Sequence, residues 1–72
     1  MYQYNYWKTR SRMAAAGLNW EDVPADYRDD LRKANHHYGA EVEYFGSRAM
    51  VRLDCGTHVP LVDCVEVESE VL

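Results

Sequence analysis

Hydrophobic and polar positions follow two different spacings along the chain, and the spacing changes near residue 39. Before that point apolar residues recur every three or four positions, as on one side of an α-helix. Residues 6–16 predict the first helix, because their alanine run favours helix and Gly17 stands where a left-handed C-cap is expected. Its apolar side holds Tyr6, Thr9, Met13 and Ala16.

A second helix is predicted from Pro24 to about Tyr38, and Asn19 offers an N-cap for the turn before it. Acidic residues come early in this segment and basic residues late, an order that complements the helix dipole. Gly39 is expected to end the helix. Its narrow apolar stripe consists of Tyr27, Leu31, Ala34 and Tyr38.

After Gly39 apolar and polar residues alternate, which predicts β-strands. A tight turn at Gly46–Ser47 would join the first two strands, and Asp63 is a misfit in the alternation of the third. The three strands are expected over 40–45, 48–53 and 60–68. Their inward set is Val42, Tyr44, Ala49, Val51, Leu53, Leu61, Val65 and Val67.

We therefore expect the fold class to be α+β, with two N-terminal helices followed by a three-stranded antiparallel β-meander. The second helix would pack across one face of that meander. A length of 72 residues suits one small domain with a thin core, spanning 1–72. Chain termini fray unless something docks them, so residues 1–5 are expected to form a flexible arm.

Charge is distributed unevenly. The formal net charge is −4, yet residues 1–18 carry three basic residues and no acidic one, while residues 19–30 carry five acidic residues against one arginine. Such polarity concerns partners rather than fold. The sequence has no apolar run long enough to span a bilayer. Its two cysteines are too few for a disulfide framework, so a reduced, cytoplasmic setting is expected.

The residue types of a zinc site occur at Cys55, His58 and Cys64, with His36 and His37 earlier in the chain. Cys64 has no closely spaced partner, and adjacent histidines on a helix point about 100° apart, so the tetrahedral set is incomplete. A Cys–His nucleophile pair would lack an orienting group and an oxyanion hole. We therefore expect no metal, no cofactor and no enzymatic activity.

The opening stretch, MYQYNYWKTRSR, is the strongest sign of a binding surface. Tyr, Trp and Arg are enriched at the hot spots of protein interfaces, because each brings a large contact area and a polar group. Single-strand nucleic-acid binders share this composition, but three cations are few, so we expect no direct contact with nucleic acid. The predicted partner-binding residues are Tyr2, Tyr4, Tyr6, Trp7, Arg10 and Arg12.

With this opening, its small size and its acidic charge, the chain resembles the small transcription regulators of Xanthomonas lytic phages. The resemblance covers the whole chain and implies a non-enzymatic phage protein that acts in the host bacterial cytoplasm. It further implies binding to host RNA polymerase, at the amino-terminal part of the β′ subunit near the RNA exit region. The implied consequences are inhibition of promoter initiation and antitermination.

Two other functions are compatible with the same sequence. An anti-defence inhibitor would use an acidic surface to mimic nucleic acid and block an RNA-guided complex. A small zinc module that binds nucleic acid would instead hold its metal at the cysteines and histidines, and would unfold when the metal is removed. The acidic surface of the first alternative comprises Asp26, Asp29, Asp30, Glu66 and Glu68.

Overall fold

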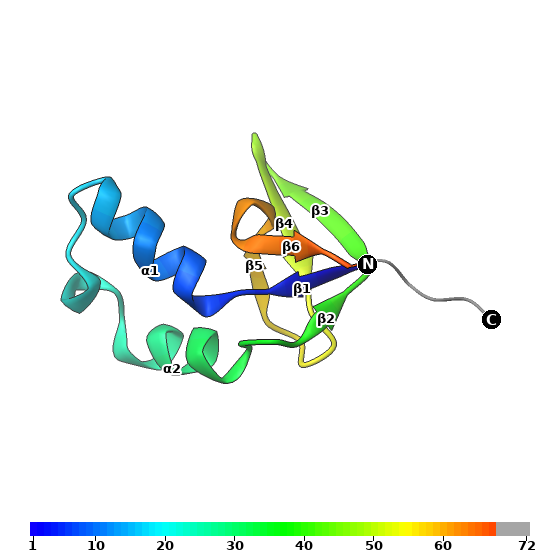
Figure 1. The fold of residues 1–72 in the computed structure, drawn as a ribbon, viewed down its shortest axis with the longest axis horizontal. Helices are drawn as coiled ribbons and strands as arrows, with labels where there is room; N and C mark the ends of the chain where they lie inside the picture. The colour runs from blue at the N-terminus through cyan, green and yellow to red at the C-terminus, as the bar shows by residue number, and fades with distance from the viewer. Residues whose placement is uncertain (68–72) are drawn as a thin grey trace.

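The computed structural model describes residues 1–67 as an α+β domain with its helices gathered at one end and its strands at the other (Figure 1). The helices are α1 (Tyr6–Ala15) and α2 (Ala25–Lys33), with short 3₁₀ turns η1 (Trp20–Asp22) and η2 (Leu61–Asp63). The strands are β1 (Tyr2–Tyr4), β2 (Tyr38–Gly39), β3 (Glu41–Phe45), β4 (Arg48–Arg52), β5 (His58–Pro60) and β6 (Cys64–Glu66).

The strands form two antiparallel sheets, with the orders β2-β1-β6 and β3-β4-β5. Strand β1 is the centre of the first sheet, because Tyr2 lies opposite both Gly39 and Glu66. Its backbone groups therefore find partners on both sides, and Tyr4 is fully buried. Residues 2–4 are thus a central strand where the sequence analysis expected a flexible arm.

The first two strands of the predicted meander form as β3 and β4 of the second sheet and are joined at the Gly46–Ser47 turn, but the single meander that was expected is divided between two sheets. The prediction of a continuous third strand over 60–68 is wrong. Pro60 ends β5, the chain turns through η2, and β6 joins the first sheet instead. The turn buries Asp63 at 1% exposure, which explains why its polarity did not fit the alternation.

The first helix begins and ends close to its predicted bounds. The Asn5 side chain accepts a hydrogen bond from the Trp7 N–H at 3.0 Å, and Gly17 follows the helix with a left-handed φ of 73°. The second helix ends earlier than predicted, because His36 adopts a left-handed φ of 70° and its N–H donates to the Tyr4 carbonyl at 2.9 Å. Pairing with β1 thus draws the chain out of the helix.

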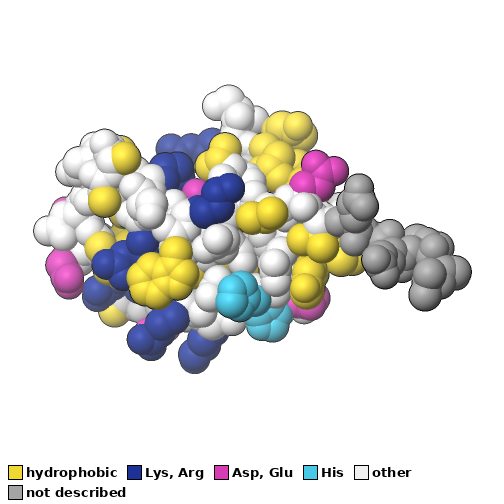
Figure 2. All heavy atoms as spheres, viewed as in Figure 1, with side chains coloured by type: hydrophobic (Ala, Val, Ile, Leu, Met, Phe, Trp, Pro, Cys, Tyr) yellow, Lys and Arg dark blue, Asp and Glu magenta, His cyan; other side chains and the backbone are white. Residues whose placement is uncertain are grey.

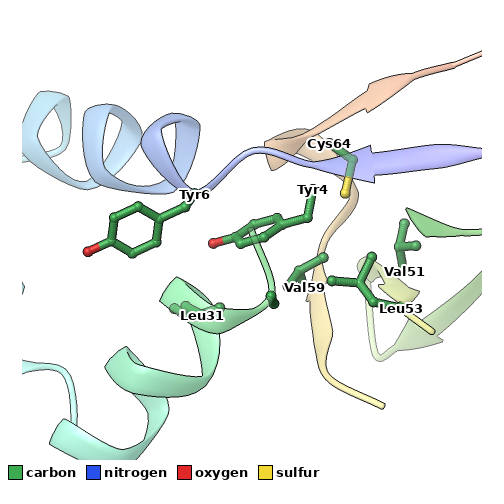
Figure 3. Packing of buried hydrophobic residues seen from close by; sticks show 8 residues of the cluster. Tyr4, Tyr6, Leu31, Val51, Leu53, Val59 and Cys64 are labelled. Carbon is green, nitrogen blue, oxygen red and sulfur yellow. The ribbon is translucent and has the colours of Figure 1, made fainter. Parts of the chain in front are cut away.

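The core lies where the helical end meets the two sheets (Figure 3). Tyr4 is its central side chain, with Leu31 of α2 on one side and Val51 and Val59 of the second sheet on the other. The helices therefore meet the sheets at one end, and the expected packing of the second helix across one face of a meander is corrected. The buried hydrophobic residues are Tyr4, Tyr6, Leu31, Ala34, Val51, Leu53, Val59 and Cys64.

Two positions of the predicted inward set are exposed. Tyr44 is 72% exposed and Val65 is 44% exposed, whereas Val51 and Leu53 are buried as predicted. The edge strand β3 has a neighbour on one side only, and β6 is reached after the η2 turn, so alternation alone did not determine which face of these strands is inward.

Candidate partner-binding surface

The six predicted partner-binding residues divide between the core, the first sheet and two sides of α1. Tyr4 is 0% exposed and Tyr6 is 7% exposed, so both belong to the core rather than to the surface. Tyr2 is half-buried in the first sheet. Among the predicted aromatic residues, Trp7 is the most accessible, at 62% exposure, and Arg10 lies beside it.

Trp7 belongs to an aromatic–arginine cluster, which we define as Tyr6, Trp7, Arg10 and Trp20. The Tyr6 ring contacts both tryptophans edge-on, with centroid distances of 5.0 Å to Trp7 and 5.7 Å to Trp20. The Arg10 guanidinium lies 4.7 Å from the Trp20 centroid and donates to the Tyr6 hydroxyl at 3.2 Å. These contacts hold the cluster in one arrangement before any partner binds.

Sequence reasoning missed Trp20, although a signal for it was present. Asn19 caps the η1 turn, since its side chain accepts from the Glu21 N–H at 3.0 Å. That cap places Trp20 in the first turn position, from which it contacts Tyr6 and Arg10 of α1. The sequence indicated the cap but not the helix that the indole would meet.

Basic residues of α2 border the cluster. A pocket of about 220 Å³ lies between Tyr6, Trp20 and the side chains of Arg28 and Arg32. Both arginines have acidic neighbours, since Arg28 pairs with Glu21 at 3.4 Å and Arg32 with Asp29 at 3.1 Å. Figure 2 shows hydrophobic side chains bordered by Lys and Arg over the helical end of the molecule.

A second hollow lies on the other side of α1. It has a volume of about 720 Å³, and among residues 1–67 the charged side chains along it are Arg12 and Arg48. Its remaining lining is mostly apolar and comes from both helices, the segment before α2, the β3–β4 turn, β4, the end of β5 and η2: Thr9, Met13, Val23, Tyr27, Leu31, Ser47, Ala49, Met50, Pro60, Leu61 and Val62. This groove and the aromatic–arginine cluster therefore share α1 but present different chemistry.

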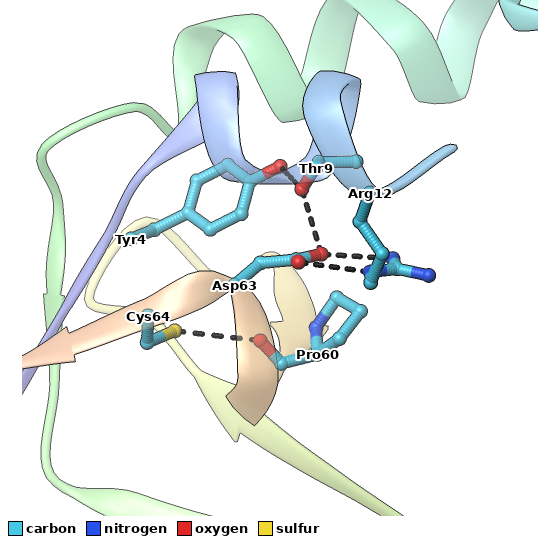
Figure 4. A network of polar contacts seen from close by, with 6 residues as sticks. All are labelled: Tyr4, Thr9, Arg12, Pro60, Asp63 and Cys64. Atoms are coloured by element: carbon cyan, nitrogen blue, oxygen red, sulfur yellow. Dashed lines mark hydrogen bonds and ion pairs between the residues drawn. The ribbon is translucent and has the colours of Figure 1, made fainter. Parts of the chain in front are cut away.

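Arg12 is engaged in a buried polar network (Figure 4). Its Nε and Nη2 donate to the two oxygens of Asp63 at 2.9 Å each, and the Thr9 hydroxyl donates to Asp63 Oδ2 at 2.8 Å. The Tyr4 hydroxyl lies 2.6 Å from Thr9 Oγ1. Burial raises the pKa of Tyr4 to about 12, and hydrogen bonding to Asp63 raises the pKa of Arg12. The network ties α1 to η2, which makes Arg12 a structural residue.

Of the residues considered for zinc or nucleophilic chemistry, His37 and Cys55 lie close together, whereas Cys64 and His58 have other partners. Cys64 is buried, its thiol donates to the Pro60 carbonyl at 3.5 Å, and burial raises its pKa to about 11, which disfavours the reactive thiolate. Cys55 is exposed, and His58 Nε2 lies 3.4 Å from a Glu43 carboxylate oxygen. Within residues 1–67, the potential ligand atoms that lie close enough to share a metal are those of His37, Asp54 and Cys55.

Among the helices of residues 1–67, none is long and apolar enough to cross a membrane. Comparison of the chain with protein-family models, with curated proteins and with solved structures found no match.

Proposed function

We propose that this protein is a non-enzymatic phage protein that binds host RNA polymerase through the aromatic–arginine cluster and alters transcription. The observation that carries the proposal is the Trp7 side chain, 62% exposed on a helix whose neighbouring rings and arginine are already fixed by mutual contacts. An indole exposed on so small a domain costs free energy in water, and a partner that covers it recovers that free energy.

Fixed aromatic and arginine side chains are the composition of interface hot spots. Ordering long side chains on binding costs about 0.5–1.5 kcal/mol for each one immobilised. Arg10 is already held against Trp20 and the Tyr6 hydroxyl, so less of this cost remains for the bound state. The cluster is therefore suited to a rigid contact with another protein.

The charge of the cluster favours a partner with acidic groups. In the part of the chain that the structure describes, Arg10 has no carboxylate partner, and its guanidinium faces aromatic groups instead. Arg28 and Arg32 add positive charge beside it, although each already has one acidic neighbour. A protein surface with apolar contacts at its centre and carboxylates at its rim would complement this arrangement.

Host RNA polymerase is named as the partner because of the resemblance to the Xanthomonas phage regulators. On that reading the cluster docks on the amino-terminal part of the β′ subunit, near the RNA exit region. Binding would inhibit initiation at host promoters and produce antitermination, with no chemical step performed by the phage protein.

The acidic alternative receives less support from the arrangement of its residues. Asp26, Asp29 and Asp30 lie on α2 at the helical end, whereas Glu66 lies at the far end of β6 opposite Tyr2 (Figure 1). Asp29 is also paired with Arg32. Glu68, the fifth acid of that proposal, lies outside the described residues. A nucleic-acid mimic needs a continuous run of negative charge, which these positions do not supply.

The test measures binding of the untagged protein to purified bacterial RNA polymerase, with Trp7→Ala as the variant. Truncating a hot-spot tryptophan should weaken binding by about 30-fold or more, equivalent to ~2 kcal/mol. Tyr44→Ala is the matched control, because Tyr44 is also a strongly exposed aromatic residue, at 72% against 62% for Trp7, but lies on β3, away from the cluster. An isolated amino-terminal fragment of β′ should compete for binding.

Each outcome bears on the proposal. Selective loss with Trp7→Ala, at unchanged thermal stability, supports the cluster as the contact surface. Equal binding by Trp7→Ala and wild type would refute the cluster as the contact surface but would leave RNA polymerase as the partner. Absence of any binding to the polymerase would refute the partner itself.

A further inference from the structure

We propose that His37, Asp54 and Cys55 form a zinc-binding site, a property separate from the proposed contact with RNA polymerase. One imidazole nitrogen, one carboxylate oxygen and the thiol sulfur of these residues all lie within 4.8 Å of one another. Imidazole, carboxylate and thiolate are the three ligand types that Zn²⁺ takes in proteins. No metal was expected from the sequence, because the set of Cys55, His58 and Cys64 with His36 and His37 was incomplete. The structure brings two of these residues, His37 and Cys55, together with Asp54, whereas Cys64 and His58 contact Pro60 and Glu43.

The distances between the three ligand atoms suit tetrahedral coordination of an ion after a small movement of the side chains. Zinc bonds of about 2.0–2.3 Å place two ligand atoms roughly 3.3–3.6 Å apart in a tetrahedron. His37 Nδ1 and Asp54 Oδ1 are now 2.6 Å apart in a hydrogen bond, so they would move apart slightly as the metal replaces the shared proton. Cys55 is exposed and its thiol can rotate about χ1 to complete the set. Three protein ligands leave the fourth position to water.

The fold already brings the two ligand-bearing segments together. His37 follows α2, and Asp54 and Cys55 lie in the turn between β4 and β5. The Asp54 N–H donates to the Tyr38 carbonyl at 2.8 Å, which joins the two segments by their backbones. Because this bond forms without a metal, the site is preorganised and the ion need not organise the fold.

The local charge also favours a cation. Arg52, which precedes Asp54 by two positions in the sequence, pairs with Glu41 at 2.6 Å and lies 3.8 Å from Glu43. Among the ion pairs of residues 1–67, the partner of Asp54 is His37 alone. A carboxylate and a thiolate held side by side carry two negative charges, which one Zn²⁺ neutralises. Figure 2 shows histidine side chains on the surface of the molecule, and the His37 side chain is 42% exposed.

The experiment titrates ZnCl₂ into the untagged chain, freed of metal by chelator and kept reduced with a phosphine, and follows the heat of binding. We expect one equivalent to bind, with a Kd of about 10 µM or tighter. Cys55→Ser and His37→Ala should each weaken binding by at least 10-fold, since each removes a ligand. Co²⁺ should give a sulfur-to-metal charge-transfer band with wild type that Cys55→Ser abolishes.

His58→Ala and His36→Ala are the matched controls and should bind within twofold of wild type. Circular dichroism of every variant without metal should match wild type, because the backbone bond between the two segments does not need the ion. Absence of stoichiometric binding would overturn the proposal, as would equal binding by Cys55→Ser. Loss of binding with His58→Ala would place the metal elsewhere and also overturn it. Since no polymerase is present, these outcomes are independent of the proposed function.

Discussion

Removal of the Arg12 guanidinium is the sharpest test of how this small domain is held together. The substitution Arg12→Met keeps an unbranched apolar side chain on α1 but deletes both hydrogen bonds to Asp63. It leaves that carboxylate at 1% exposure, with the Thr9 hydroxyl as its remaining side-chain donor among residues 1–67. We expect the free energy of unfolding to fall substantially at neutral pH.

The magnitude follows from the burial of the two partners. Breaking a fully buried ion pair by removing one partner costs about 3–5 kcal/mol, because the other charge stays buried without compensation. The Arg12 side chain is 45% exposed, so water can take over part of its role, and the expected loss is about 2–3 kcal/mol. A domain of this size has roughly 4–11 kcal/mol in total, so Tm should fall by about 10–20 °C.

The assay is urea unfolding at pH 7 of wild type, Arg12→Met, Asp63→Asn and the double variant. Asn at position 63 retains an oxygen for Thr9 but carries no charge, so Arg12→Met should cost at least ~1 kcal/mol less in that background. Arg48→Met is the control, since Arg48 has no ion pair among residues 1–67, and should change stability by less than about 0.5 kcal/mol. An Arg12→Met variant as stable as this control, or equally destabilised in both backgrounds, would refute the reasoning.

Two further predictions concern alkaline stability and a close backbone approach. Burial raises the pKa of Cys64 from 9.0 to about 11 and that of Tyr4 from 10.0 to about 12, so the fold favours both protonated forms. Their contribution is complete below pH 9 and is lost between pH 9 and 12, about 2–3 kcal/mol for each group. The urea midpoint of wild type should therefore be lower at pH 10.5 than at pH 8, and this decrease should be smaller in Cys64→Ala. An equal decrease in that variant would contradict the raised pKa of Cys64 as its cause. Gly39→Ala should destabilise by about 2–3 kcal/mol, because the added Cβ would collide with the Arg52 carbonyl oxygen. Gly46→Ala meets nothing within 4 Å and should cost only the ~1 kcal/mol of its left-handed φ, so equal melting temperatures for the two variants would contradict this packing.

Local signals in the sequence predicted the elements whose cause is local. The alanine run with Gly17 indicated α1, and alternating apolar residues around Gly46–Ser47 indicated the hairpin of β3 and β4. The overall α+β class followed from these signals. Elements that depend on distant partners were predicted poorly, since β1 needs β2 and β6 on either side before three residues can form a strand.

The candidate surface was predicted in composition but not in arrangement. The sequence analysis selected Trp7 and Arg10, which do lie together on α1, but included Tyr4, whose ring fills the core. Three tyrosines at alternate positions gave no means of telling an exposed arm from a central strand, because both are extended. Trp20 was omitted because its contact with Arg10 joins two elements that the sequence cannot place side by side.

Amino-acid order by itself determined where α1 and α2 begin and where the Gly46–Ser47 turn lies, since capping, alanine content and glycine conformation act within a few residues. Tertiary structure alone decided that Asp63 is buried and that Asp54, rather than His58 or Cys64, joins His37 and Cys55. A buried carboxylate is stable only beside a donor such as Arg12, and that donor comes from a helix some fifty residues away in the chain. Packing across the whole domain determines which side chains meet. Asp63, which did not fit the alternation of the predicted third strand, therefore joins η2 to α1 through its hydrogen bonds with Arg12.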